Sequence, residues 1–315
     1  MVIDTTAFNP DEWTVNMGSI KLDDCHFRFV NKEGKPYPNE FDPEYIEVSR
    51  LNAEILDLRI VGDTLRARME HFSALERSGF EVKQMQSIVS VSPRASICRD
   101  LLLQTNNSTL GNYYAMHYER FPDFTDYIRK VRMDARLVNA KIDPKDIAYF
   151  APQLRQLPVG ICKVSGKGGG TVDALFAQNL DITDGYSTVK GDLRITGLPD
   201  VDVSIFDFQN GEIFTTGNSV LRYAPMLKDN PNINLQAVDY AYFKGSFTGL
   251  LSDFAAKGTL TTNLGNIAAD MKMKLPETAQ PTYSGVFKSE GFDAGRFLNQ
   301  PSLGKTTFDA ELEGA

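Results

Sequence analysis

Three histidines, His26, His71 and His117, are the first side chains to consider for acid–base or metal chemistry. They stand far apart in the sequence, and no HExxH segment pairs two of them on a helix face. No Gly-x-Ser-x-Gly segment supplies a nucleophile on a strained turn either. Isolated histidines of this kind are typical of structural or surface positions, so we predict no catalytic role for them.

A glycine-rich run, Gly166-Lys167-Gly168-Gly169-Gly170-Thr171, has the composition of a phosphate-binding loop. A P-loop requires Ser or Thr directly after the lysine and a helix that starts there. Here glycine follows the lysine, and the surrounding residues alternate as in a strand. We therefore predict close backbone packing or a β-bulge at this run.

Acidic and sulfur ligands do not form a recognisable metal site. The aspartates of residues 181–207 lack the spacing and the closing glutamate of an EF-hand, and turn chemistry explains Asp184-Gly185 and Pro199-Asp200. Cys25, Cys98 and Cys162 are too sparse for a metal knuckle or a disulfide framework. We predict no metal and no cofactor, and the lack of any catalytic set favours a binding, structural or conduit protein over an enzyme.

The composition narrows the possible partners. The chain has 315 residues, a net charge of -8 and a pI near 5.1. No basic stripe is present to release counterions from nucleic acid, so we exclude nucleic acid as a partner. No segment has the run of about eighteen apolar residues that spans a bilayer. The chain stops within a strand pattern at Phe308–Ala315, and we expect it to be part of a longer protein.

Most of the chain has the alternating pattern of β-strands, so strands must position the side chains considered above. In the segment from Ile267 to Leu275, every second residue is apolar, and Asp270, Lys272 and Lys274 fall between them. Side chains alternate between the two faces of a strand, so this pattern predicts one apolar and one polar face. The same alternation recurs at 131–137, 193–195 and 308–312. A slip in the alternation at Asp23-Asp24 predicts a bulge.

An internal repeat predicts the domain organisation. Residues 166–199 and 245–276 each read as a strand, a short loop, a second strand, a glycine turn and a third strand. We predict a first β segment at 1–160, a first repeat at 161–240 and a second repeat at 241–315. Two or three short helices are expected, near 122–130, 144–152 and 219–227. The aromatic cluster of residues 113–127 predicts a buried corner, with a membrane-facing or ligand-facing belt as the alternative.

The order and spacing of several segments resemble the AsmA-like family, and within it the TamB-type translocation and assembly proteins in their Bacteroidetes form. The resemblance covers most of the chain. It is carried by Ile20–Phe29 with Phe41–Ile46, by Val138–Leu154, by Lys190–Asp200, and by Tyr283–Phe287, Phe292–Leu298 and Leu303–Gly314.

This resemblance implies a long periplasmic protein that is anchored in the inner membrane by a segment outside this chain. It implies a sheet that folds along its length into an open trough, the β-taco, whose apolar lining shields phospholipid acyl chains on their way to the outer membrane. An outer-membrane barrel related to BamA or TamA is the implied protein partner, through regions absent here.

On this basis we predict a lipid groove, and phospholipid as the ligand. Small and flexible side chains such as Ala269 and Met271 suit a mobile ligand. The alternatives are a structural or adhesive β module with a filled core, and a carbohydrate-binding or hydrolytic β domain. The predicted groove-lining residues are Val131, Met133, Ala135, Leu137, Leu193, Ile195, Leu260, Ile267, Ala269, Met271, Met273, Leu275, Phe308, Ala310 and Leu312.

Overall fold

The computed structural model describes residues 9, 11–31, 35–156, 158–228, 230–276 and 280–314. The chain divides into two compact units, Met1–Val172 and Asp173–Ala315. The predicted boundary at 160/161 therefore lies inside the first unit, and the one at 240/241 lies inside the second. Both units are mainly β, with antiparallel strands and short helices, which confirms the predicted fold class.

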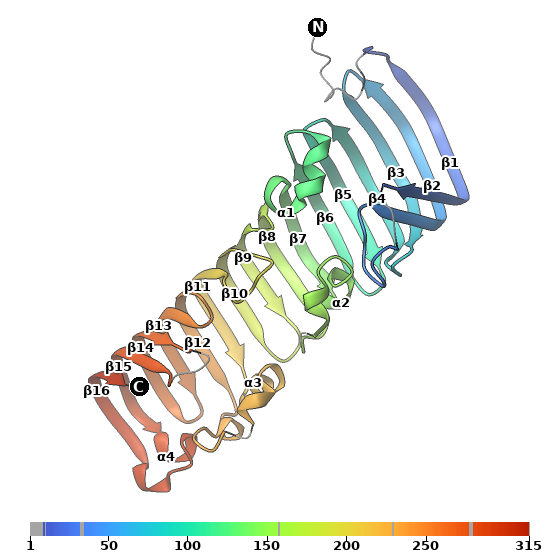
Figure 1. The fold of residues 1–315 in the computed structure, drawn as a ribbon. Coiled ribbons are helices and arrows are strands. Elements are labelled where there is room, and N and C mark those ends of the chain that lie inside the picture. Colours follow the sequence, from blue (N-terminus) through green and yellow to red (C-terminus); the bar gives the residue numbers. More distant parts are fainter. Residues whose placement is uncertain are drawn as a thin grey trace. The chain divides into compact units, whose positions relative to one another are not determined.

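Eight strands form the sheet of the first unit, and each pairs antiparallel with the next strand along the chain (Figure 1). The strands are β1 (Val15–Val30), β2 (Tyr45–Val61), β3 (Thr64–Glu76), β4 (Glu81–Ser92), β5 (Ala95–Thr105), β6 (Thr109–His117), β7 (Arg132–Ile142) and β8 (Cys162–Thr171).

The second unit repeats this arrangement with eight shorter strands, again paired in chain order. They are β9 (Ala174–Thr183), β10 (Thr188–Thr196), β11 (Ile205–Thr215), β12 (Ala241–Gly249), β13 (Asp253–Thr262), β14 (Gly265–Lys274), β15 (Thr282–Asp293) and β16 (Lys305–Gly314). The two predicted repeat copies correspond to β8, β9 and β10 and to β12, β13 and β14.

Short helices occupy the connections between strands. The helices are η1 (Phe121–Asp126), α1 (Tyr127–Lys130), α2 (Pro144–Ile147), η2 (Pro152–Gln156), α3 (Gly217–Tyr223), η3 (Pro225–Leu227), η4 (Leu235–Ala237), α4 (Ala294–Phe297) and η5 (Pro301–Leu303). All three predicted helical regions contain helix, and α4 is an additional one. Asp143 caps α2 by accepting a 2.9 Å hydrogen bond from the Lys145 amide, with Pro144 in the first helical position.

The strands bend at bulges where asparagine or aspartate adopts left-handed backbone angles. Asn179 in β9 and Asn210 in β11 have φ near 50°, and the pairing register shifts beside both. Asp192 in β10 accepts hydrogen bonds from the Asn210 side chain (3.0 Å) and the Asn179 amide (2.9 Å), which hold its pKa below the usual range. Asp24 has φ of 46° at a register shift in β1, which confirms the predicted bulge. These bulges curve the strands visible in Figure 1.

One buried carboxylate fastens α2 to the turn between β5 and β6. Asp146 is only 4% exposed, and it accepts hydrogen bonds from the Thr105 hydroxyl (2.5 Å) and from the amides of Asn107 and Ser108 (2.9 Å each). Burial opposes the ionisation of Asp146, but these hydrogen bonds outweigh it and hold the pKa of the carboxyl below its usual range.

We expect Asp146→Ala to lower the unfolding free energy by about 2 kcal/mol near neutral pH, because the Thr105 hydroxyl and the amides of Asn107 and Ser108 lose their acceptor. A depressed pKa means that this stabilisation is complete above the unfolded-state value of about 3.9 and is lost as pH falls through the lower folded-state value. Urea unfolding at about pH 7 and about pH 3 measures it, and the gap between wild type and variant should narrow in acid. Asp57→Asn, which removes the charge of an exposed ion pair with Arg68 and tolerates the left-handed φ of 53° at this position, is the control and should cost less than about 1 kcal/mol. A gap that is independent of pH would contradict the assignment.

Candidate functional site: an open apolar sheet face

One face of the second unit is apolar across all eight strands. Residues directly opposite each other on antiparallel strands share a face. One such row runs from Leu193 to Phe208 and Phe247, and on through Ala256 to Met271. We call this side of the second unit its apolar face. It holds the predicted lining residues Leu193, Ile195, Leu260, Ile267, Ala269, Met271, Met273, Phe308, Ala310 and Leu312.

The first unit has an apolar face of the same kind. Met133, Ala135 and Leu137 in β7 lie on it, and their partners in β8 are Gly170, Gly168 and Gly166. The glycine-rich run is therefore part of strand β8, and no helix starts there. Because its glycines have no side chains, this part of the apolar face is shallow. The strand confirms the rejection of a P-loop, and the register shift beside Gly166 agrees with the predicted bulge.

Two predicted lining residues do not lie on an open face. Val131 precedes β7 and is fully buried, with its amide donating to the Tyr127 carbonyl of α1 (3.3 Å). A side chain without exposed surface cannot touch a passenger, so Val131 is removed from the lining set. Leu275 follows the end of β14, and its amide donates to the Ser252 carbonyl of the neighbouring turn (2.7 Å). It belongs to the edge of the sheet.

The side chains on the apolar face of the second unit are mostly half-buried. Met271, Met273, Ala269 and Leu193 keep part of their surface open, and Phe208 is one of the few buried residues there. The strands make their main contacts with their neighbours in the sheet. Among the described residues of this unit, no second sheet covers the face. Side chains on neighbouring strands thus shield each other from solvent within the face, but no second layer covers them.

Glycines keep the middle of this face shallow. Gly211, Gly245 and Gly258 lie opposite one another on β11, β12 and β13. A Cβ atom on Gly211 would collide with the Phe208 ring, and one on Gly258 would lie 2.8 Å from the Phe243 ring. The two rings therefore lie over the glycines. Flat ring surfaces, and not upright side chains, form the floor at this row, which we call the glycine row.

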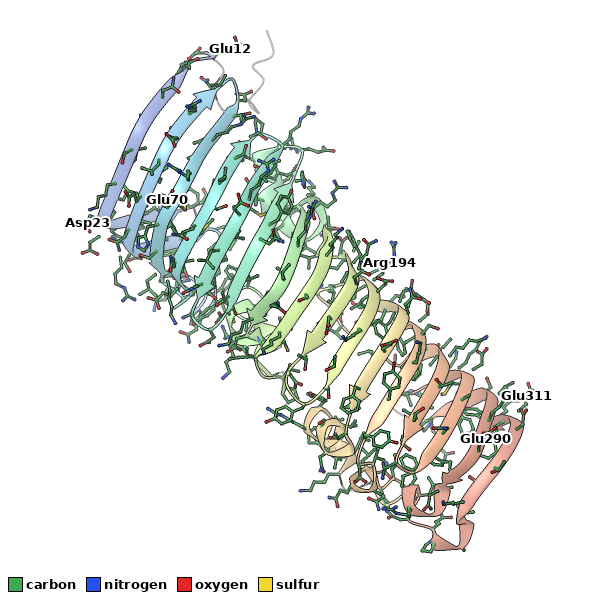
Figure 2. All side chains as sticks on the ribbon, turned by 180° about the vertical axis from the view of Figure 1, so that it is seen from behind. Glu12, Asp23, Glu70, Arg194, Glu290 and Glu311 are labelled. Carbon is green, nitrogen blue, oxygen red and sulfur yellow. The ribbon has the colours of Figure 1, made fainter. Side chains whose placement is uncertain are left out.

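The opposite face of the second unit is polar and carries cross-strand ion pairs. Lys190 contacts Asp181 at 3.0 Å, and Lys244 contacts Glu212 at 3.2 Å. The hydrogen bond with Asp181 raises the pKa of Lys190. Exposed pairs of this type contribute little to stability. These ion pairs keep one face of the sheet charged and solvent-exposed, while the other face is apolar. Figure 2 shows the side chains from behind, with Arg194 labelled.

In the first unit, α1 covers part of the apolar face. The Tyr127 hydroxyl lies 3.3 Å from that of Tyr114 and 3.8 Å from the Met116 sulfur. Tyr118 and Phe124 stack beside them with ring centroids 4.9 Å apart. Burial raises the pKa of Tyr114. This confirms a buried corner for the aromatic cluster, although Tyr113 is separate and packs under Arg136 (5.1 Å).

The candidate metal ligands and turn aspartates of the described residues lie apart from one another. No cluster of three or more His, Cys, Asp or Glu side chains there could hold a metal ion. His26 contacts Glu47 at 3.4 Å on an exposed surface. Asp184 accepts hydrogen bonds from the amides of Tyr186 and Ser187, as its predicted turn requires. None of the helices in the described ranges has the length and apolarity to cross a membrane.

Two surface hollows lie at strand ends, and a third, of about 470 Å³, lies within β9, β10 and β11 beside Asn179, Asp192 and Gln209. One of about 550 Å³ is lined by polar groups of η4 and α4, among them Asn234 and Arg296. Another of about 250 Å³ is formed by Lys83, Asn107 and neighbours near the turn between β5 and β6. The apolar face is instead an open surface.

Comparison with protein-family models, curated proteins and solved structures finds no match to this chain.

Proposed function

We propose that this chain is a non-catalytic segment of a lipid conduit, in which the apolar face shelters phospholipid acyl chains. The observation that carries the proposal is the continuous, half-exposed apolar face over the eight strands of the second unit. From the resemblance to AsmA/TamB-type proteins we propose that such a conduit lies in the periplasm, anchored to the inner membrane by a segment outside this chain. Transport toward the outer membrane and a barrel partner there are parts of the same proposal.

The dimensions of the face suit an acyl chain. Eight strands at about 4.8 Å spacing give a face roughly 34 Å long, about twice the 15 Å depth of one leaflet of a bilayer core. Each methylene that moves from water onto an apolar surface gains about 0.8 kcal/mol. A dozen sheltered methylenes therefore lower the free energy of a lipid outside a membrane by about 10 kcal/mol, without any catalytic group.

The lining also suits a ligand that must move. Met271 and Met273 are flexible and adapt to different shapes. The rings over the glycine row offer a smooth floor without polar anchors. A β module with a filled core would need a second layer on this face. The contact of α1 with Tyr114 and Met116 supplies such cover only locally, in the first unit.

Photocrosslinking in cells tests the proposal. A photoreactive residue at Met271 or Met133 should form adducts with phospholipid, because both side chains lie on an apolar face. The matched probes replace Lys257 and Arg132. Lys257 follows Ala256, the residue paired with Met271, and Arg132 precedes Met133. Both lie on a polar face and should form no lipid adducts. Equal labelling from both faces, or no lipid adduct at all, would overturn the conduit.

A further inference from the structure

The two long edges of the second unit differ. Because consecutive antiparallel strands reverse direction, their connections alternate between the two edges. The connections after β9, β11, β13 and β15 share one edge, where Figure 1 shows α3 and α4, and we call it the helical edge. The connections after β10, β12 and β14 share the other, which has no helix among its described residues and which we call the bare edge.

The helical edge is closed by packing. Val238, Leu264, Phe292 and Ala294 form a small core there, against which Ile267 also packs. Backbone hydrogen bonds tie the helical segments to the strand ends: the Asn234 amide donates to the Phe297 carbonyl (2.7 Å) and the Asp293 amide to the Leu264 carbonyl (2.8 Å). The Tyr223 hydroxyl of α3 donates to Asp184 at 2.5 Å. The connections at this edge are thus ordered by a small core and by hydrogen bonds.

Among the described residues of the bare edge no such core forms, and apolar side chains are exposed at the tips of its turns and strands. Turn tips ordinarily carry polar residues and glycine. Here the exposed fractions are between 40% and 62%, and the Leu275–Ser252 hydrogen bond joins two of the turns. We define the apolar lip as Val201, Val203, Ile205, Leu251, Leu275 and Tyr283.

Two cations lie on the polar face next to this lip. Arg194 in β10 and Lys272 in β14 belong to one cross-strand row, and neither is in an ion pair among the described residues. The carboxylate opposite Arg194, Asp207, accepts hydrogen bonds from Gln209 (2.6 Å) and Thr248 (3.2 Å). Apolar groups and unpaired cations thus border each other, a pairing that fits an amphiphile with an anionic head.

We propose that the apolar lip is where a phospholipid enters the second unit sideways. Its acyl chains cross the lip onto the apolar face, and its phosphate stays on the polar side near either Arg194 or Lys272, which lie four strands (about 19 Å) apart. This inference rests on the proposed lipid-binding function and adds the route of loading and the class of head group.

The test compares the rate of loading with the amount of lipid bound. The purified full chain is mixed with vesicles of phosphatidylcholine and phosphatidylglycerol that contain a fluorescent phosphatidylglycerol. The lip variant combines Val203→Asn, Leu251→Asn and Leu275→Asn, all exposed positions. The matched control combines Met226→Asn and Leu303→Asn, which are 76% and 45% exposed at the helical edge.

We expect the lip variant to load about tenfold more slowly, with the same amount of lipid bound at equilibrium, and the control to load like wild type. Unchanged loading by a lip variant that binds lipid would overturn the lateral route and leave the proposed function standing. A wild-type chain that binds no lipid would overturn both. A photoreactive residue at Leu251 or Leu303 in the otherwise wild-type chain provides a second measurement, in which only Leu251 should be labelled early.

A separate pair of variants tests the head group. Arg194→Gln with Lys272→Gln should slow the loading of phosphatidylglycerol severalfold and leave the loading of diacylglycerol, which has no phosphate, unchanged. Equal effects on both lipids would overturn the role given to the two cations.

Discussion

Replacing Gly245 with valine will abolish stable folding of the second unit or lower its unfolding free energy by about 3 kcal/mol or more. A Cβ atom at this position would collide with the Lys257 carbonyl oxygen of β13 and come within 2.8 Å of the Phe243 ring. The obstacle on one side is backbone, which cannot turn aside as a side chain does. Chemical denaturation of the purified chain, followed by far-UV circular dichroism, measures the loss.

Gly18→Ala provides the contrast. A Cβ atom at Gly18 in β1 meets no atom within 4 Å, and the residue does not have a left-handed φ angle. This substitution should leave stability unchanged or raise it by about 0.5 kcal/mol. If Gly245→Val were equally harmless, neither the close approach of β13 nor the Phe243 ring over Gly245 could be as described.

A single charge on the apolar face should abolish lipid binding. Ala268 and Ala269 are adjacent alanines of β14 on opposite faces, with Lys288 opposite the first and Phe287 opposite the second. We expect Ala269→Asp to reduce the lipid bound by the purified chain at least about tenfold, because a carboxylate must lose water before an acyl chain can cover it. Ala268→Asp adds the same charge to the polar face and should bind like wild type.

Binding of fluorescent phosphatidylethanolamine, at concentrations below saturation, gives the readout. Circular dichroism checks that both variants keep their strands. Equal affinities for the two variants would show that the lipid does not rest on the predicted face, and equal losses would point to a general effect of charge.

The strands were predictable because one physical rule governs them. Alternation at Ile267–Lys274 and Met133–Leu137 assigned the correct residues to a common face, because each of these strands is straight over that stretch. The turn with Gly265 and the bulge at Asp24 also carried local signals. The alternation did not predict where the strands begin and end. Val131 and Leu275 continue the pattern, but β7 begins at Arg132 and β14 ends at Lys274.

Features that depend on distant residues were not predictable. Nothing in the sequence around Asn179 and Asn210 reveals that Asp192 bridges their bulges. The helix α4 has only four residues, and its packing partners Val238 and Leu264 lie far away in sequence. The difference between the helical and the bare edge emerges only after the pairing order is known, because it depends on which connections share an edge.

The alternation of connections has a consequence for how such a sheet can grow. Inserting one strand would send every later connection to the opposite side, so that α4 and its small core would change sides relative to α3. Inserting a hairpin of two strands keeps every later connection where it was and lengthens the face by roughly 10 Å. Duplications that preserve a sheltered side and an accessible side must therefore add strands in even numbers.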